Sequence, residues 1–135
     1  MRLMLDLNVL LDMVQRREPF YAASVAVIDR VFKREVSGCL PAHALTTLHY
    51  VIRKFAGRDR ADETVDWLLG GFDVIPQDKP QFLRARALAF SDFEDAVVAS
   101  AAEAGGCDWI ITRNVADFDK SPIAAVTPEE FLFRS

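Results

Sequence analysis

Short apolar runs alternate along this chain with longer stretches in which apolar side chains recur at helical spacing. The short runs, which favour strands, lie at residues 2–6, 37–41, 71–76, 105–112 and 123–126. The expected helices cover approximately residues 9–14, 19–34, 42–55, 60–69, 78–89 and 92–104, with a short final turn after residue 127. Strands joined by helical crossovers form a parallel sheet with helices on both faces. The sequence therefore predicts an α/β protein, a three-layer α/β/α fold around a central, mainly parallel sheet, in one domain over residues 1–135.

Capping residues mark three of the expected helix starts. We expect Asn8 to cap the first helix, because its side chain can accept a hydrogen bond from the helix N-terminus. Ser91 is the expected cap of the helix over 92–104, with Glu94 as its capping-box partner. Thr127 and Glu130 show the same spacing and predict a capping box at the final turn.

The composition is that of a globular protein, with 51% hydrophobic and 27% charged residues. The net charge of −4 argues against binding nucleic acid by overall attraction, although a metal ion held among acids would cancel part of that charge locally. No apolar run reaches the length of a membrane span and Asp6 interrupts the apolar N-terminus, so we expect a cytoplasmic protein with no membrane partner. Cys39 and Cys107 lack metal-ligand spacing and are expected to be buried, reduced thiols.

Four aspartates fall at strand ends or helix starts of the predicted fold. Asp6 closes the first strand, and Asp117 lies just past the strand near 109–112. Asp92 and Asp95 are three residues apart at the start of a mostly apolar helix, so they share a helical face. Each acid alone has an ordinary explanation, because helix dipoles favour acids in the first turn and aspartate is common in turns. Together they lie on one rim of a parallel sheet, where clustered carboxylates suit Mg²⁺ or Mn²⁺.

The sequence resembles the PIN-domain family over essentially its full length. The resemblance is carried by "MLDLNVLLDMV" near the N-terminus, by "SDFEDAVVASAAEAGGCDWIITRNVADF", and by the closing "TPEEFL". In the family, an aspartate opens a buried helix, a glycine-rich turn follows, and the next strand ends in Thr-Arg-Asn and then Asp-Phe. The residues that match this pattern are Asp95, Thr112, Asn114 and Asp117.

The resemblance implies a Mg²⁺- or Mn²⁺-dependent endoribonuclease that hydrolyses RNA phosphodiester bonds. Many small bacterial members similar to this chain are VapC-type toxins of type II toxin–antitoxin pairs. Such toxins are commonly homodimers and are inhibited by a small antitoxin that covers helices and the active site. The expected partners are therefore an RNA substrate, a cognate antitoxin protein and a second copy of this chain. The alternative is a catalytically weak PIN fold that binds RNA or a protein partner.

Two departures from the family pattern affect the expected site. The usual opening is Asp-Thr-Asn, whereas position 7 is Leu here, and we expect Thr112 to supply the missing hydroxyl. Typical members carry a Glu in the third helix, but this helix, "AHALTTLHYVIRK", contains no acid. The resemblance then implies that Asp92 or Glu94 completes the ligand set, with Asp92 preferred because it shares a helical face with Asp95.

The resemblance gives each polar residue at this rim a role in catalysis. The expected metal ligands, direct or through water, are Asp6, Asp95, Asp117 and Asp92. The residues expected to orient these ligands and the attacking water through hydrogen bonds are Asn8, Thr112 and Asn114, with Glu94 in a supporting place.

Three basic residues are the expected contacts to RNA. Arg113 lies between Thr112 and Asn114 and is therefore expected beside the scissile phosphate. Arg53 and Lys54 lie near the end of the third helix and supply further positive charge.

Two other features have structural explanations. His43 and His49 are six residues apart and so do not share a helical face, and we expect surface or core histidines rather than metal ligands. The apolar segment over 19–32 is either core or the surface on which an antitoxin helix or a dimer mate packs.

Overall fold

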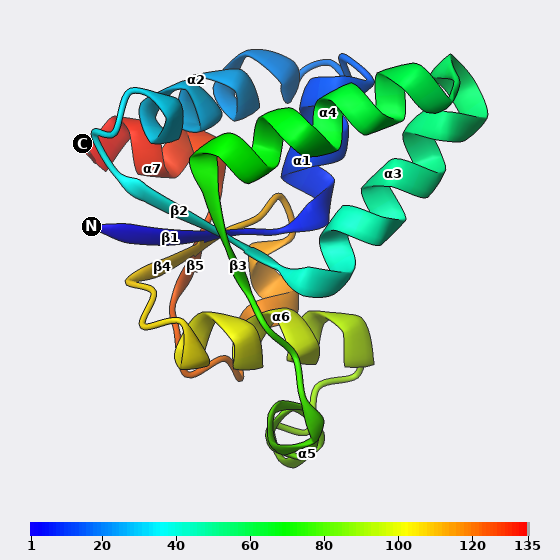
Figure 1. Ribbon diagram of the computed structural model, residues 1–135. Coiled ribbons are helices and arrows are strands. Elements are labelled where there is room, and N and C mark those ends of the chain that lie inside the picture. The colour runs from blue at the N-terminus through cyan, green and yellow to red at the C-terminus, as the bar shows by residue number, and fades with distance from the viewer. Residues whose placement is uncertain (135) are drawn as a thin grey trace.

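Five parallel strands form the central sheet of the computed structural model, which describes residues 1–134 (Figure 1). The strands are β1 (Arg2–Leu5), β2 (Ser37–Pro41), β3 (Phe72–Ile75), β4 (Trp109–Ile111) and β5 (Ala125–Val126). Their order across the sheet is β3-β2-β1-β4-β5, and every neighbouring pair is parallel, which confirms the predicted sheet. These strands therefore end at one edge, where the polar residues that follow them come together.

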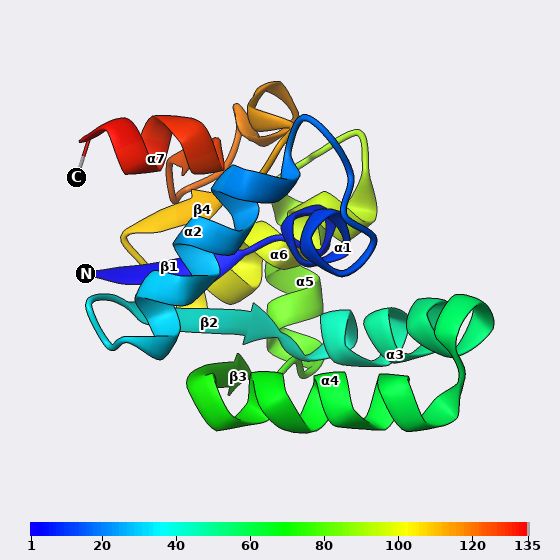
Figure 2. The same cartoon turned by 90° about the horizontal axis from the view of Figure 1, so that it is seen from above.

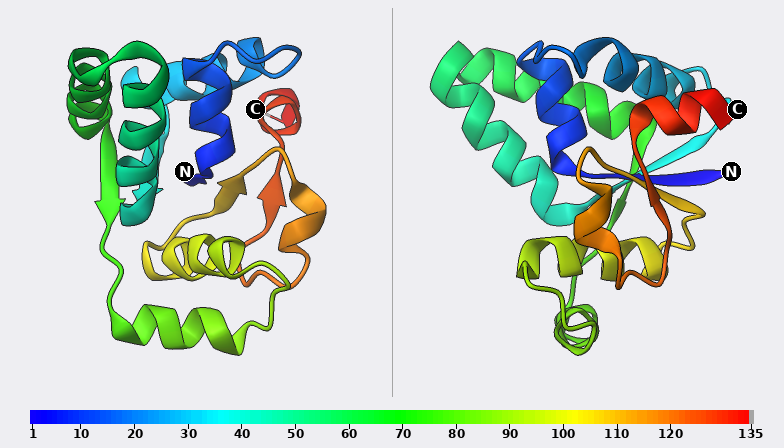
Figure 3. Two further views of the ribbon diagram at one scale, coloured as in Figure 1. Left: turned by 90° about the vertical axis from the view of Figure 1, so that its right-hand side faces the viewer. Right: turned by 180° about the vertical axis from the view of Figure 1, so that it is seen from behind.

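Helices cover both faces of the sheet and complete the predicted three layers (Figures 1 and 3). They are α1 (Leu7–Val14), α2 (Tyr21–Phe32), α3 (Ala42–Ala56), α4 (Arg58–Gly71), α5 (Lys79–Ala87), α6 (Phe93–Ala104), α7 (Pro128–Arg134) and the 3₁₀ helix η1 (Val115–Phe118). α1 to α4 and α7 lie over one face, and α5 and α6 lie over the other. α3 and α4, separated by Gly57 at φ 90°, lie side by side (Figure 2). Within residues 1–134, no helix is long and apolar enough to cross a membrane.

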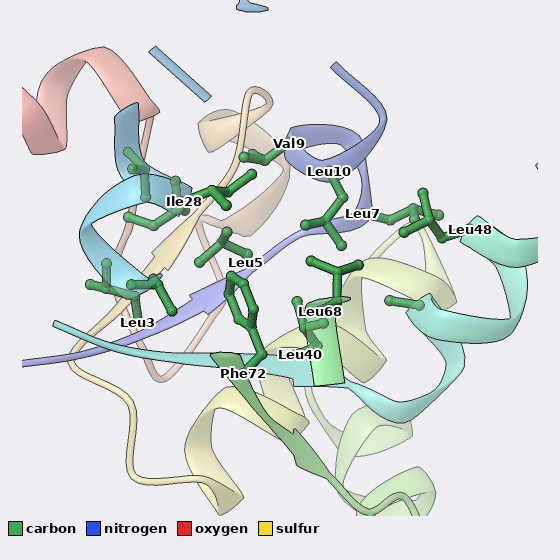
Figure 4. Packing of buried hydrophobic residues seen from close by; sticks show 14 of the residues in the cluster. Leu3, Leu5, Leu7, Val9, Leu10, Ile28, Leu40, Leu48, Leu68 and Phe72 are labelled. Atoms are coloured by element: carbon green, nitrogen blue, oxygen red, sulfur yellow. The ribbon is translucent and has the colours of Figure 1, made fainter. Parts of the chain in front are cut away.

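The side chains of β1 alternate between the two layers of the core. Leu3 and Leu5 belong to the larger apolar cluster, to which α1 to α4 and α7 contribute (Figure 4). Met4 faces the opposite side and packs in a second cluster with residues of α6. Cys39 and Cys107 are buried free thiols in this second cluster, as predicted. Because β1 is buried on both faces, the residue that follows it is held at a well-defined place on the sheet edge.

The start of α1 differs from the prediction. β1 ends at Leu5, and the next residue, Asp6, has an extended backbone and caps the helix by accepting a hydrogen bond from the Leu7 N–H. Asn8 therefore lies inside α1, and its predicted capping role is wrong. Aspartate and asparagine are comparable caps, so the local sequence did not show which of the two residues begins the helix.

The start of α6 also differs from the prediction. The helix begins at Phe93 and is capped by Asp92, whose carboxylate accepts a hydrogen bond from the Asp95 N–H at 3.1 Å. The predicted capping box between Ser91 and Glu94 is therefore wrong. Aspartate and serine are comparable caps, so the local sequence did not distinguish two adjacent starts.

Two other helix starts show one correction and one confirmation. α2 begins at Tyr21, two residues after the predicted start at residue 19. The capping box of α7 is confirmed, because the Glu130 N–H donates to Thr127 Oγ1 at 3.0 Å and the Thr127 N–H donates to Glu130 Oε1 at 3.2 Å.

Candidate functional site

Asp6 lies at the sheet edge, between β1 and α1, and is 6% exposed. Its Oδ1 accepts a hydrogen bond from the Leu7 N–H at 2.8 Å. Its Oδ2 accepts from the Thr112 hydroxyl at 2.9 Å and from the Asn8 side-chain amide at 3.3 Å. Burial raises the pKa of Asp6, and the hydrogen bonds from Thr112 and Leu7 oppose that rise. Because a carboxylate has about four acceptor positions, one position on Oδ1 remains after the bonds made by the described residues.

Thr112 joins the end of β4 to Asp6 and to the loop that follows. Its buried hydroxyl donates to Asp6 and accepts a hydrogen bond from the Asn114 N–H at 3.2 Å. Asn8 links the same two segments, because its amide oxygen accepts from the Arg113 N–H at 3.4 Å. The structure therefore places the Thr112 hydroxyl against Asp6, where we expected it to compensate for the apolar residue at position 7.

The acids at the start of α6 face those at the strand ends. Asp95 is half-buried, and its pKa is raised to about 7, first by burial and then by repulsion from neighbouring acids. These acids, in decreasing order of effect, are Asp92, Asp6, Asp117 and Glu94. The sequence-predicted acids thus lie close enough together to repel one another.

Asn114 and Asp117 lie on the solvent side of this cluster. Both are exposed, and the Asp117 N–H donates to the Asn114 carbonyl at 3.1 Å within the turn that leads into η1. Their side chains are therefore accessible to a substrate at the sheet edge.

The carboxylates at this sheet edge suit a metal ion that keeps part of its water shell. Among residues 1–134, no three His, Cys, Asp or Glu side chains already form a group that could enclose a metal ion. Mg²⁺ keeps several waters and is usually bound by only one or two carboxylates. The remaining acceptor position on Asp6 and the repulsion acting on Asp95 fit such an ion, because a cation would relieve that repulsion.

Arg113 lies against a buried acid and an aromatic ring. Its Nε lies 3.1 Å from Oδ2 of Asp12, which is 1% exposed, and its Cζ lies 4.5 Å from the centre of the Phe20 ring. The guanidinium therefore links the residue after β4 to α1 and to the start of α2, and its contact with RNA stays a prediction. Sequence reasoning missed Asp12, although an acid within the apolar stretch "VLLDMV" was a signal.

The other predicted RNA contacts lie away from the acids. Arg53 and Lys54 are exposed in the last turn of α3, where Lys54 Nζ lies 4.9 Å from the centre of the Tyr50 ring. Arg53 is about 16 Å along the helix axis from the start of α3. Contact between these residues and RNA stays a prediction.

His43 lies next to Glu94 at the candidate site, although we did not predict it there. We expected a surface or core histidine, but its Nε2 lies 3.8 Å from Glu94 Oε1, and a positive charge on its ring would lower the pKa of Asp6. The signal in the sequence was its place two residues after β2, at the edge where the strands end. His49 instead contacts Asp62 Oδ1 at 2.7 Å, which is consistent with the expected surface position.

Comparison with known families identifies this fold. The family model described as "PIN domain" matches residues 2–116. The chain belongs to the PIN-domain family. No curated protein matches the sequence.

Solved structures similar to this PIN domain include chains from complexes of three bacteria. One is VapBC2 of Rickettsia felis bound to a promoter DNA fragment, with 16% identity and a TM-score of 0.71 over 94% of this chain and 98% of that chain. Another is a toxin–antitoxin complex of Klebsiella pneumoniae, with 19% identity and a TM-score of 0.70 over 93% and 96%. A third is FitAcB of Neisseria gonorrhoeae, with 17% identity and a TM-score of 0.66 over 94% and 98%. At these identities the likeness shows a shared fold.

Proposed function

We propose that this PIN domain is a Mg²⁺- or Mn²⁺-dependent endoribonuclease and the toxin of a type II toxin–antitoxin pair. The observation that carries the proposal is the convergence of acids at one sheet edge, where burial and mutual repulsion raise the pKa of Asp95 to about 7. Such a cluster is suited to a divalent cation. Membership of a family that consists largely of ribonucleases supports the reaction.

The residues at the sheet edge have separate parts in this hydrolysis. Asp6 and Asp95 would hold the ion, and Thr112 keeps the Asp6 carboxylate in one orientation through its hydroxyl. When bound, a divalent ion stabilises charge on the phosphate oxygens and lowers the pKa of a coordinated water. Asn114 is exposed beside these groups and would orient the attacking water through hydrogen bonds, and the exposed Asp117 would be a further ligand of the ion, directly or through water.

The partner surfaces belong to the same proposal. A pocket of about 390 Å³ between α1, α2 and α4 is the proposed docking site for an antitoxin helix, since similar solved structures are toxin–antitoxin complexes. Its lining combines apolar and charged side chains: Met13, Val14, Arg16, Tyr21, Arg60, Glu63, Thr64 and Trp67. Tyr50 and Phe55 are exposed on α3 and are the proposed contact surface of a homodimer.

The test is cleavage of a single-stranded RNA pool by purified protein with Mg²⁺, with Mn²⁺ or with a chelator. We expect cleavage only with metal and its loss in Asp95→Asn, whereas Asp59→Asn, at an exposed position in α4, retains it. Thermal unfolding establishes that each variant is folded. RNA binding without cleavage by the folded wild type would instead support the alternative, a PIN-fold binding module.

A further inference from the structure

His43 lies in the first turn of α3, the helix from which the usual acid of the family is missing. α3 begins at Ala42, directly after β2, and β2 pairs with β1, whose end leads into Asp6. His43 is therefore the first long polar side chain of α3 at the sheet edge. Its Nε2 lies 3.8 Å from Glu94 Oε1, so this edge of the ring faces Glu94 in the first turn of α6.

Gln77 determines which ring nitrogen of His43 carries hydrogen. The His43 backbone N–H donates to Gln77 Oε1 at 2.8 Å, and this identifies the amide atom as oxygen, because an N–H needs an acceptor. His43 Nδ1 lies 3.1 Å from the same oxygen and must therefore donate to it. In the neutral ring the lone pair is then on Nε2, the nitrogen nearest to Glu94.

The free nitrogen of His43 has the surroundings of a metal ligand. Nε2 is buried and has no hydrogen-bond partner among the described residues. Metal-ligating histidines usually donate their other ring N–H to a carbonyl or carboxylate, and the Gln77 amide oxygen fills that place here. A nitrogen and an oxygen 3.8 Å apart can bind the same ion, because two bonds of about 2.1 Å span up to about 4.2 Å.

We propose that His43 Nε2, together with Glu94, is a ligand of the divalent ion and takes the place of the acid missing from α3. This inference rests on the metal site of the proposed function. Imidazole is a softer ligand than carboxylate, so a site that includes it favours Mn²⁺ over Mg²⁺ more strongly than an all-carboxylate site. The sheet-edge acids and the histidine together would thus set the metal preference.

The test is electron spin echo envelope modulation spectroscopy, which detects nitrogen bound to Mn²⁺. The protein carries no histidine tag, because a tag would add imidazole nitrogen. The chain has two histidines, so an imidazole signal comes from His43 or His49. We expect nitrogen modulation in the wild type, its loss in His43→Gln, and its retention in His49→Gln. Calorimetry should show that His43→Gln weakens Mn²⁺ binding by at least about tenfold, and Mg²⁺ binding by less.

The outcomes separate this inference from the proposed function. Mn²⁺ binding that depends on Asp95 but shows no nitrogen modulation in the wild type would overturn the role of His43 and leave the carboxylate site intact. Nitrogen modulation that persists in His43→Gln would overturn it as well. A folded wild type that binds no Mn²⁺ would overturn both. If His43→Gln is unstable, His49→Gln still assigns the signal, because nitrogen modulation retained in that variant comes from His43 and its loss there would overturn the inference.

Discussion

Asp6 is held by three hydrogen bonds and still has an acceptor position to offer. The bonds from Leu7, Asn8 and Thr112 fix the carboxylate in a buried place, where an unpaired charge would be costly. Of these donors, the Thr112 hydroxyl comes from the residue that follows β4, far along the chain. At the scale of single residues, the orientation of the proposed metal ligand therefore depends on a side chain that is not itself a ligand.

Replacing Thr112 by Val should show this dependence. The change keeps the shape of the side chain and removes the donor to Asp6, so we expect the free energy of unfolding to fall by about 1–3 kcal/mol. Mn²⁺ affinity should fall roughly 10- to 100-fold. Urea unfolding and calorimetry measure the two effects, and Thr64→Val in α4 is the matched control. Unchanged affinity in a folded Thr112→Val variant would contradict the orienting role.

The pair formed by Asp12 and Arg113 gives a second prediction. Asp12→Asn leaves a partly buried guanidinium without its counter-charge, and we expect the free energy of unfolding to fall by about 3 kcal/mol. The exposed pair of Asp29 and Lys33 is the control, since Asp29→Asn should cost no more than about 1 kcal/mol. Equal effects of the two substitutions in urea unfolding would show that the pair of Asp12 and Arg113 contributes no more to stability than an exposed ion pair.

Asp95 gives a prediction about pH in metal-free protein. Its pKa is about 7 in the folded state against an ordinary value of 3.8, so the folded protein holds this proton more tightly than the unfolded chain. This contribution to stability is complete below about pH 4, is lost as the pH rises towards 7, and stays lost above it. Asp95→Asn removes the dependence, and its stability relative to the wild type should increase from about pH 5 to about pH 8. A constant difference across urea titrations in that range would contradict the shifted pKa.

At the scale of elements, the helix starts and the site share the same residues. Asp6 caps α1 and Asp92 caps α6, so two of the proposed catalytic acids also determine where their helices begin. This double use explains two wrong cap predictions, because Asn8 and Ser91 are equally good caps one or two residues away. The choice depended on the end of β1 and on packing against α6, and short-range patterns do not contain that information.

Thr127, which caps α7, and Ser91, which does not cap α6, allow a matched comparison of two alanine substitutions. Thr127→Ala removes the acceptor for the Glu130 N–H and should lower the free energy of unfolding by about 1 kcal/mol. Ser91→Ala, at an exposed position ahead of Asp92, should change it by no more than about 0.5 kcal/mol. A larger loss from Ser91→Ala in urea unfolding would restore Ser91 as the cap of α6.

At the scale of the whole molecule, the alternation of strand and helix patterns was enough to predict the fold and the rim of acids. Parallel strands all end at one edge, so Asp6 and Asp117 were expected together without knowledge of any contact. The pairs that were missed join distant segments: His43 with Gln77, and residue 12 with residue 113. Such contacts depend on how α1, α3 and the loop after β3 pack, which periodicity does not show.

The central claim is that the sheet edge holds a divalent ion through Asp6 and Asp95. Its most direct test is calorimetric titration of Mn²⁺ into the metal-free wild type and Asp95→Asn, with folding verified by circular dichroism. We expect saturable binding in the wild type and its loss in the variant. Asp95→Asn removes a carboxylate that must be ionised to bind the cation, and with it the repulsion between acids that the cation would relieve. A folded wild type without binding, or equal binding by the two proteins, would contradict the claim.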